Sequence, residues 1–115
     1  MIDYNKEMVS ALKTVLPTYH ELTLHSGLKT PCISYQELNN YATDQGDTLG
    51  YSIVSFQIKI WGNDLEVLMK HAKQVDDIVR PLGFTRISSG ELYDRASSMI
   101  QKILTYEATA LETFN

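Results

Sequence analysis

The fold is decided by the stretch YSIVSFQIKIW (Tyr51–Trp61) together with GNDLEVLMKHAKQVDDIVRPLGFT (Gly62–Thr85), which follows it directly. In the first part, large apolar side chains alternate with polar ones, which predicts a strand with one buried face. The apolar set is Val54, Phe56, Ile58 and Ile60, and the polar set opposite is Ser55, Gln57 and Lys59. A strand, a turn, a helix and the start of another strand follow in order, which indicates an α/β or α+β domain.

An amphipathic helix is predicted from Leu65 to Arg80. Its apolar residues recur at steps of three and four, which makes a stripe wide enough to pack on a sheet. Asn63 is the expected N-cap, with Glu66 three residues later as in a capping box, and Pro81 ends the helix because it lacks a backbone donor. The stripe consists of Leu65, Leu68, Ala72, Val75 and Val79, widened by Met69 and Ile78.

The N-terminal part predicts one helix and two short strands. The helix runs from residue 3 or 4 to Val15, with Asp3 as its N-cap and Pro17 beyond its end. The strands are expected at Tyr19–Leu24 and Pro31–Leu38, where apolar and polar residues alternate.

The segment Asn39–Gly50 is polar, rich in turn-forming residues and without periodicity. We expect a long connection between two strands, and loops of this length are often functional. It is the leading candidate for a segment that contacts a partner, and a mobile solvated tip explains the same composition. Tyrosine is enriched at protein interfaces, so Tyr41 within this segment is best explained by a partner. Tyr35 and Tyr106 are expected to pack at the edge of the core.

The C-terminal part predicts the last strands. Phe84–Ile87 forms a short strand that loosens at Ser88–Gly90 and continues, with a bulge or bend, through Glu91–Asp94. A turn at Arg95–Ser98 leads to the final strand, Met99–Thr109. The whole chain, residues 1–115, is thus expected to be a single α+β domain. Its mixed, mainly antiparallel sheet of four to five strands packs against two helices, in the order α-β-β-β-α-β-β.

Composition excludes several classes of protein. The formal net charge is −4 and the pI about 5.2, whereas a nucleic-acid binder usually carries a basic patch. No apolar run approaches the roughly 20 residues that cross a bilayer, and the first residues lack the pattern of a secretory signal. Cys32 is the single cysteine, so an internal disulfide is impossible and a reducing compartment is favoured. We therefore expect neither nucleic acid nor membrane as a specific partner.

No metal or nucleophilic site is predicted. His20, His25 and His71 lack the spacing of metal ligands. Cys32 follows Pro31 at a strand start without a basic neighbour that would lower its pKa, so a structural thiol is expected.

Phosphate-binding and acid–base patterns are missing as well. The six glycines are dispersed and form no phosphate-binding loop. Asp76 and Asp77 are adjacent on the predicted helix and point about 100° apart, so we expect them on a solvated acidic face. No pattern in the sequence therefore indicates catalysis, and no cofactor is expected.

The order of elements resembles that of the small tail terminator and tail completion proteins of long-tailed bacteriophages and prophages. The resemblance spans nearly the whole chain and is a pattern match rather than a motif of fixed chemistry. It is carried by PCISY (Pro31–Tyr35), IKIW (Ile58–Trp61), the helix Leu65–Arg80, PLGFTR (Pro81–Arg86) and KILTY (Lys102–Tyr106).

The resemblance implies a structural protein that is not an enzyme and that assembles as a ring, commonly a hexamer. Such a ring caps the tail tube and presents a surface to the head–tail connector, so the implied location is the virion, and the bacterial cytoplasm during assembly. A ring requires two different patches that meet on neighbouring copies. We expect Tyr41, Asp44 and Asp47 to face the lumen or an axial partner. Arg86, Tyr93 and Arg95 are expected on the other surface.

Two other hypotheses are compatible with the sequence. One is a small-molecule-binding or enzymatic α+β domain with a pocket between the second helix and the sheet; a mostly apolar pocket leaves little trace in a sequence. The other is a regulatory module that dimerises by pairing of sheet edges. Related head-to-tail joining and minor tail proteins have similar lengths and fit the pattern as well.

Overall fold

The computed structural model describes residues 2–25, 27–44 and 49–113 and confirms the α+β fold. The five-stranded sheet has the order β1-β2-β3-β5-β4, in which β1 and β2 are parallel and all other neighbours antiparallel. The elements are α1 (Asn5–Leu12), β1 (Thr18–His20), the 3-10 helix η1 (Glu21–Thr23), β2 (Cys32–Asp44), β3 (Leu49–Gly62), α2 (Leu65–Val79), the 3-10 helix η2 (Arg80–Leu82), β4 (Thr85–Asp94) and β5 (Met99–Thr113). Neither α1 nor α2, the helices of the described residues, could span a membrane.

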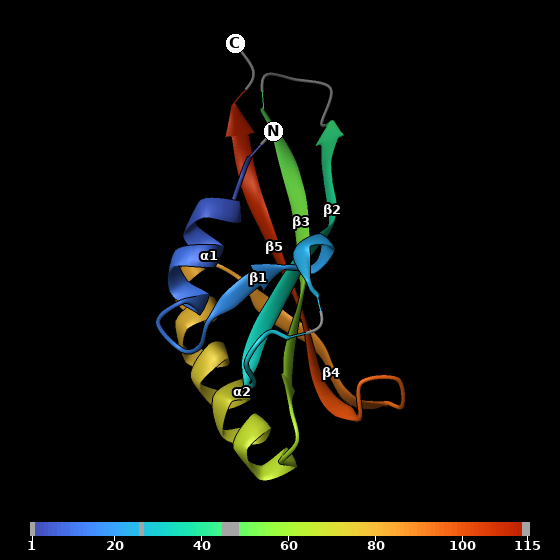
Figure 1. The fold of residues 1–115 in the computed structure, drawn as a ribbon. Helices are drawn as coiled ribbons and strands as arrows, with labels where there is room; N and C mark the ends of the chain where they lie inside the picture. The colour runs from blue at the N-terminus through green and yellow to red at the C-terminus, as the bar shows by residue number, and fades with distance from the viewer. Residues whose placement is uncertain (1, 26, 45–48, 114–115) are drawn as a thin grey trace.

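The core lies between the helices and one face of the sheet. Figure 1 shows α1 and α2 following one another along the same side of the sheet. The predicted apolar face of β3 is buried here, and each large apolar side chain withdrawn from water contributes about 1.5–3 kcal/mol. Among the residues that fill the core are Met8 and Leu12 from α1, Val54, Phe56, Ile58 and Ile60 from β3, Leu68, Val75 and Val79 from α2, and Leu104 and Tyr106 from β5.

The other face of the sheet, which we call the open face, carries no helix. The odd-numbered residues of β3 and β5 belong to it, because the even-numbered residues of the same strands lie on the core side and successive side chains point to opposite faces. At one end the segment that contains η1 folds over this face, and Lys59 on β3 forms an ion pair with Glu21 of η1 at 2.7 Å.

At the other end, β2, β3 and β5 continue past the helices as a projecting arm (Figure 1). We define the arm as residues 41–44, 49–53 and 109–113. The molecule is correspondingly elongated, at 51 × 25 × 22 Å. The predicted loop Asn39–Gly50 is therefore wrong at both ends: residues 39–44 extend β2, and Leu49 and Gly50 begin β3.

The sequence pattern did not predict how far the strands extend into the arm, and this has a physical reason. The described residues of β2 and β5 in the arm are largely exposed, and the buried positions of β3 there are Gly50 and Ser52, which are not large apolar residues. An apolar–polar alternation is therefore missing from this part of the sequence. The backbone ladder holds these residues extended instead, with Tyr41 opposite Ile53 and Asp44 opposite Gly50. The same ladder carries β5 to Thr113, beyond the predicted end at Thr109.

The helix boundaries also differ from the prediction. Asp64, not Asn63, caps α2, because its Oδ1 accepts a hydrogen bond from the backbone N–H of Glu66 at 3.0 Å. The first helix ends at Leu12 rather than Val15. There the N–H of Val15 donates a hydrogen bond to the carbonyl oxygen of Leu12, three residues earlier instead of the four of an α-helix. This tighter turn follows the helix just before Pro17.

The predicted strand Tyr19–Leu24 is shorter than expected. It ends at His20, whose Nδ1 accepts a hydrogen bond from the N–H of Leu22 at 3.1 Å and so starts η1. In contrast, β4 is a single strand from Thr85 to Asp94. The register of its pairing with β5 shifts between Arg86 and Ser88, not at Gly90 where a bulge or bend was expected.

Candidate functional site

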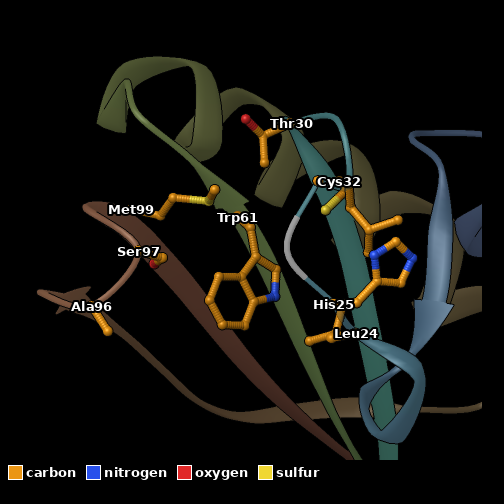
Figure 2. Close-up of a pocket in the computed structure, with 10 residues that line it drawn as sticks. Leu24, His25, Thr30, Cys32, Trp61, Ala96, Ser97 and Met99 are labelled. Carbon is orange, nitrogen blue, oxygen red and sulfur yellow. The ribbon is translucent and has the colours of Figure 1, made fainter.

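A pocket of about 390 Å³ opens on the open face, at the end of the sheet away from the arm (Figure 2). Its floor is formed by Cys32 on β2 and Trp61 on β3, which are direct partners across the ladder. Leu24, His25, Gly27, Leu28 and Thr30 line it on one side, and Ala96, Ser97 and Met99 line it on the other. We call this hollow the Trp61 pocket; its apolar lining comes from Leu24, Leu28, Cys32, Trp61 and Met99.

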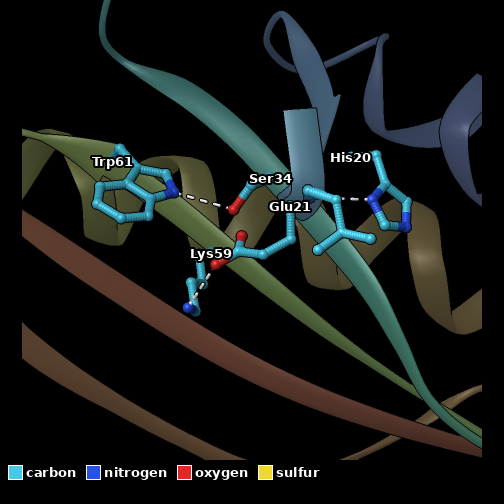
Figure 3. A network of polar contacts seen from close by, with 6 residues as sticks. His20, Glu21, Ser34, Lys59 and Trp61 are labelled. Carbon is cyan, nitrogen blue, oxygen red and sulfur yellow. Dashed lines mark hydrogen bonds and ion pairs between the residues drawn. The ribbon is translucent and has the colours of Figure 1, made fainter. Parts of the chain in front are cut away.

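The indole of Trp61 is held in a defined orientation. Its Nε1 donates a hydrogen bond to Ser34 Oγ at 2.9 Å (Figure 3). The ammonium of Lys59 lies 5.9 Å from the centroid of the same ring, within range of a cation–π contact. A ring fixed in this way presents a preformed apolar surface, which lowers the entropic cost of binding.

The chain that leads into the Leu24 side of the pocket is tied to the sheet by a short polar network (Figure 3). The His20 ring caps η1, and η1 in turn carries Glu21, whose Oε1 bonds to Lys59 Nζ at 2.7 Å. Both of these charged side chains are largely shielded from water, so the ion pair is screened less than a surface pair. The network therefore fixes η1, which leads directly into Leu24 at the pocket.

Cys32 contributes a thiol to the pocket. The sequence predicted a structural thiol here but not its place in a pocket. Its side chain is only 3% exposed, and burial raises the pKa of the thiol. A neutral, buried thiol is a poor nucleophile, because the thiolate is the reactive form.

The open face carries a second feature on the arm. Tyr41 lies directly opposite Ile53, and Tyr51 lies directly opposite Leu111, so the four side chains are neighbours on one face. Tyr41, Tyr51 and Leu111 are 51%, 40% and 57% exposed. We call Tyr41, Tyr51, Ile53 and Leu111 the arm patch. A cluster of exposed tyrosine and aliphatic side chains is typical of a protein interface.

The predicted interface residues fall in different parts of the molecule. Tyr41 belongs to the arm patch, and Asp44 is the last residue of β2 at the arm end. Asp47 lies outside the described residues. Tyr93 is exposed on β4, and Arg95 stands in the turn next to Ala96 of the Trp61 pocket.

Arg86, the remaining predicted interface residue, is bound within the molecule. Its Nη1 lies 3.1 Å from Asp76 Oδ1, and the hydroxyl of Tyr106 donates to the same oxygen at 3.0 Å. Asp76 Oδ2 also pairs with Arg80 Nε at 3.0 Å. The expectation that Asp76 is simply solvated was wrong: the carboxylate ties α2 to β4 and β5. Only the step of four from Asp76 to Arg80 was visible in the sequence.

Tyr106 is correspondingly perturbed. Burial, the hydrogen bond to Asp76 and the negative charge of that carboxylate raise the pKa of its hydroxyl far above the ordinary range, against the smaller opposing effect of Arg86 and Arg80. The hydroxyl therefore stays protonated and acts as a donor.

A second hollow, of about 410 Å³, lies along α2 and β4 on the helix side of the sheet. Three of the charged side chains that line it are paired: Arg86 binds Asp76, and Lys102 Nζ lies 2.7 Å from Glu91 Oε1. The space between α2 and the sheet itself is filled by fully buried side chains such as Leu68 and Val75.

Within the described part of the chain, no three His, Cys, Asp or Glu residues are grouped closely enough to hold a metal ion. No protein-family model matches the chain, and no curated protein matches it.

Proposed function

We propose that this chain is a structural protein of a bacteriophage or prophage, which assembles as a ring, caps the tail tube and joins it to the head–tail connector. The proposal combines the sequence resemblance with one observation. The elongated sheet presents two unlike surfaces, the arm patch at one end and the Trp61 pocket at the other.

Two unlike surfaces are what a ring requires. In a heterologous contact, one patch meets a different patch on the next copy, and the series closes into a ring if the rotation allows it. An isologous dimer, by contrast, uses the same patch twice. The arm patch and the Trp61 pocket lie at opposite ends of a molecule 51 Å long, so each can contact a different neighbouring copy.

The edges of the sheet support assembly as well. Within the described residues, β4 pairs with β5 alone, and it exposes Ile87, Leu92 and Tyr93. At the other edge, β1 covers β2 only over Ile33–Tyr35. Open strand edges invite pairing with another chain.

The charged side chains of the interior fit a mechanical role. Asp76, Arg86, Lys59 and Glu21 bond to one another or to their neighbours across elements, so they fix the scaffold in place. Side chains that are paired in this way make the scaffold rigid. A rigid scaffold suits a protein that holds a tail tube and a connector together.

The experiment is native mass spectrometry and electron microscopy of the purified chain, alone and mixed with tail tubes. We expect a closed ring, or a monomer that forms a ring on the end of the tube, and we expect the chain among the proteins of purified virions. A stable monomer or dimer that ignores tail tubes and carries a bound small molecule would contradict the proposal. Neighbouring genes for head, connector or tube proteins are an independent check.

A further inference from the structure

We infer that the outer edge of β4 is a docking site for an extended segment of another protein, which adds to the five-stranded sheet as a further strand. The occupant is a peptide strand with apolar side chains at alternate positions, not a second copy of this chain. The inference is separate from the ring-forming function, because it concerns a contact with a different chain.

The edge of β4 offers unused backbone groups. Within the described residues β4 pairs with β5 alone, and successive residues of a paired strand direct their N–H and C=O groups to opposite sides. Every second residue of β4 therefore presents a donor and an acceptor on the outer side. The pairing with β5 keeps one register over residues 88–94, so the outer groups of this segment form a regular row that an extended backbone matches.

This segment of β4 lacks lysine and proline, the residues that most often protect a strand edge. The register shift of β4 lies before it, between Arg86 and Ser88, and eight of the ten residues of β4 are exposed. The edge of β2 is different, because β1 covers part of it and its register shifts between Glu37 and Asn39. Of the two edges of the sheet, β4 is thus the one that suits a regular added strand.

Exposed apolar side chains stand on both faces of the sheet beside this edge. Leu92 lies opposite Gln101 on the open face and is 59% exposed. Tyr93 lies opposite Ile100 on the helix side and is 62% exposed, and Met69 of α2 is half-buried on the same side. Alternate side chains of an added strand would cover these residues, and exposed apolar groups of this kind are typical of an interaction site.

The hollow beside α2 gives the helix-side residues of an added strand a place to enter. The helix packs over β3 and β5, and the space of about 410 Å³ next to it is bordered by Ser89 of β4. Met69, Ala72 and Leu104 form its apolar part. The charges that line the hollow balance, because the two ion pairs described above are joined by Lys73 and Asp77, which have opposite signs. The side chain that enters is therefore apolar rather than charged.

The sequence of the edge disfavours pairing with the β4 of a second copy. The regular segment, residues 88–94, is centred on Glu91. An antiparallel second copy that used the whole segment would place Glu91 directly opposite the same glutamate, and like charges at directly opposite positions are destabilising. A strand of different sequence, with an apolar residue at that position, avoids this repulsion.

The test begins with a random display library of linear peptides, selected against the intact chain. We expect the selected peptides to carry apolar residues at alternate positions. Synthetic copies should bind with one site per chain, as measured by calorimetry. A selection that yields no binding peptide, or peptides without this alternation, would overturn the inference.

Two exposed positions distinguish docking at β4 from binding elsewhere. Leu92→Lys places a charge beside the edge, and Met69→Lys places one at the hollow. Leu22→Lys is the matched control, because Leu22 is 82% exposed and lies in η1. We expect the selected peptide to bind each of the first two chains about tenfold more weakly, or worse, and the control as tightly as wild type. Urea unfolding verifies that each variant is folded; equal affinity for all of them would place the binding site elsewhere.

Methylation of the peptide backbone tests the hydrogen bonds themselves. Alternate N–H groups of a strand face the same neighbour. N-methyl groups on one alternate set of peptide amides should therefore abolish binding, and on the other set they should leave it nearly unchanged. Equal effects of the two sets would contradict addition of the peptide to the sheet.

Pairing between copies would give a different result. If wild type associates in sedimentation, Leu92→Lys abolishes that association and no peptide is selected, the edge belongs to a second copy and the inference is wrong. The ring-forming function is measured without peptide, so it stands or falls independently of this result.

Discussion

Cys32 and Trp61, the single cysteine and the single tryptophan of the chain, are direct partners across the β2–β3 ladder and line the same pocket. Each is therefore a unique reporter of the same surface. Trp61 responds to a change in polarity through its fluorescence, and Cys32 responds to access through its reactivity.

The thiol of Cys32 should react slowly with a thiol reagent such as dithionitrobenzoate. Burial hides the sulfur and raises the pKa of the thiol, so at neutral pH the reactive thiolate is scarcer than in a free cysteine. The rate is expected to rise as pH increases and to reach that of a free thiol in urea. Reaction in the folded state as fast as in urea would contradict the buried position.

Tyr106→Phe should destabilise the fold by about 1.5–3 kcal/mol, because the hydrogen bond to the Asp76 carboxylate is lost while the ring still packs. Urea unfolding measures this effect. Tyr93→Phe is the matched control: its exposed side chain should change the unfolding free energy by less than about 0.5 kcal/mol.

The same tyrosine predicts a pH dependence. The folded-state pKa of Tyr106 is raised above the unfolded value of about 10. The stability that its protonated hydroxyl contributes to the folded state is therefore fully present below pH 10. As pH rises further, the unfolded state loses the proton first, and the stability of wild type should fall relative to Tyr106→Phe. A constant difference between the two proteins from pH 8 to 11 would contradict this linkage.

Asp64→Ala should destabilise the protein by about 0.5–2 kcal/mol, because α2 loses its N-cap. Asn63→Ala is the control, and we expect a change below about 0.5 kcal/mol. Thermal or urea unfolding decides between them. If the two effects are reversed, the cap assignment is wrong.

Glu91→Gln should cost more stability than Lys102→Met. The Lys102 side chain is 6% exposed, so without Glu91 its buried charge lacks a compensating partner, at a cost of about 1–3 kcal/mol. Replacing the lysine removes the buried charge altogether, and such exchanges are often neutral or stabilising. Equal losses in urea unfolding would show that the pair is effectively solvated.

Much of the fold followed from local patterns. The alternation of Val54, Phe56, Ile58 and Ile60 with polar residues predicted the buried face of β3, and all four are fully buried. Of the stripe on α2, Leu68, Ala72, Val75 and Val79 are buried as predicted, whereas Leu65 and Met69 are exposed. The turn before Met99 was confirmed. The ring-forming function stays a prediction from the resemblance and from the surfaces described above.

The candidate site was largely invisible in the sequence. Leu24, Cys32, Trp61 and Met99 are spread over the chain, and only the pairing of β2 with β3 and of β3 with β5 brings them together. Of the arm patch, Tyr41 was singled out as an interface residue, but its place on a strand was missed. The signal for the rest was weak, because exposed strands impose no periodicity.

The sequence by itself determined the buried face of β3, most of the buried face of α2 and the order of helix, strand and turn. Burial of one face leaves apolar residues at every second position of a strand and at every third or fourth position of a helix. Tertiary structure decided what Asp76 binds, how far β2 and β5 extend, and that Trp61 lines a pocket. Those features depend on contacts between residues distant in the chain, such as Asp76 with Tyr106, and the periodicity of neighbouring residues carries no information about such contacts.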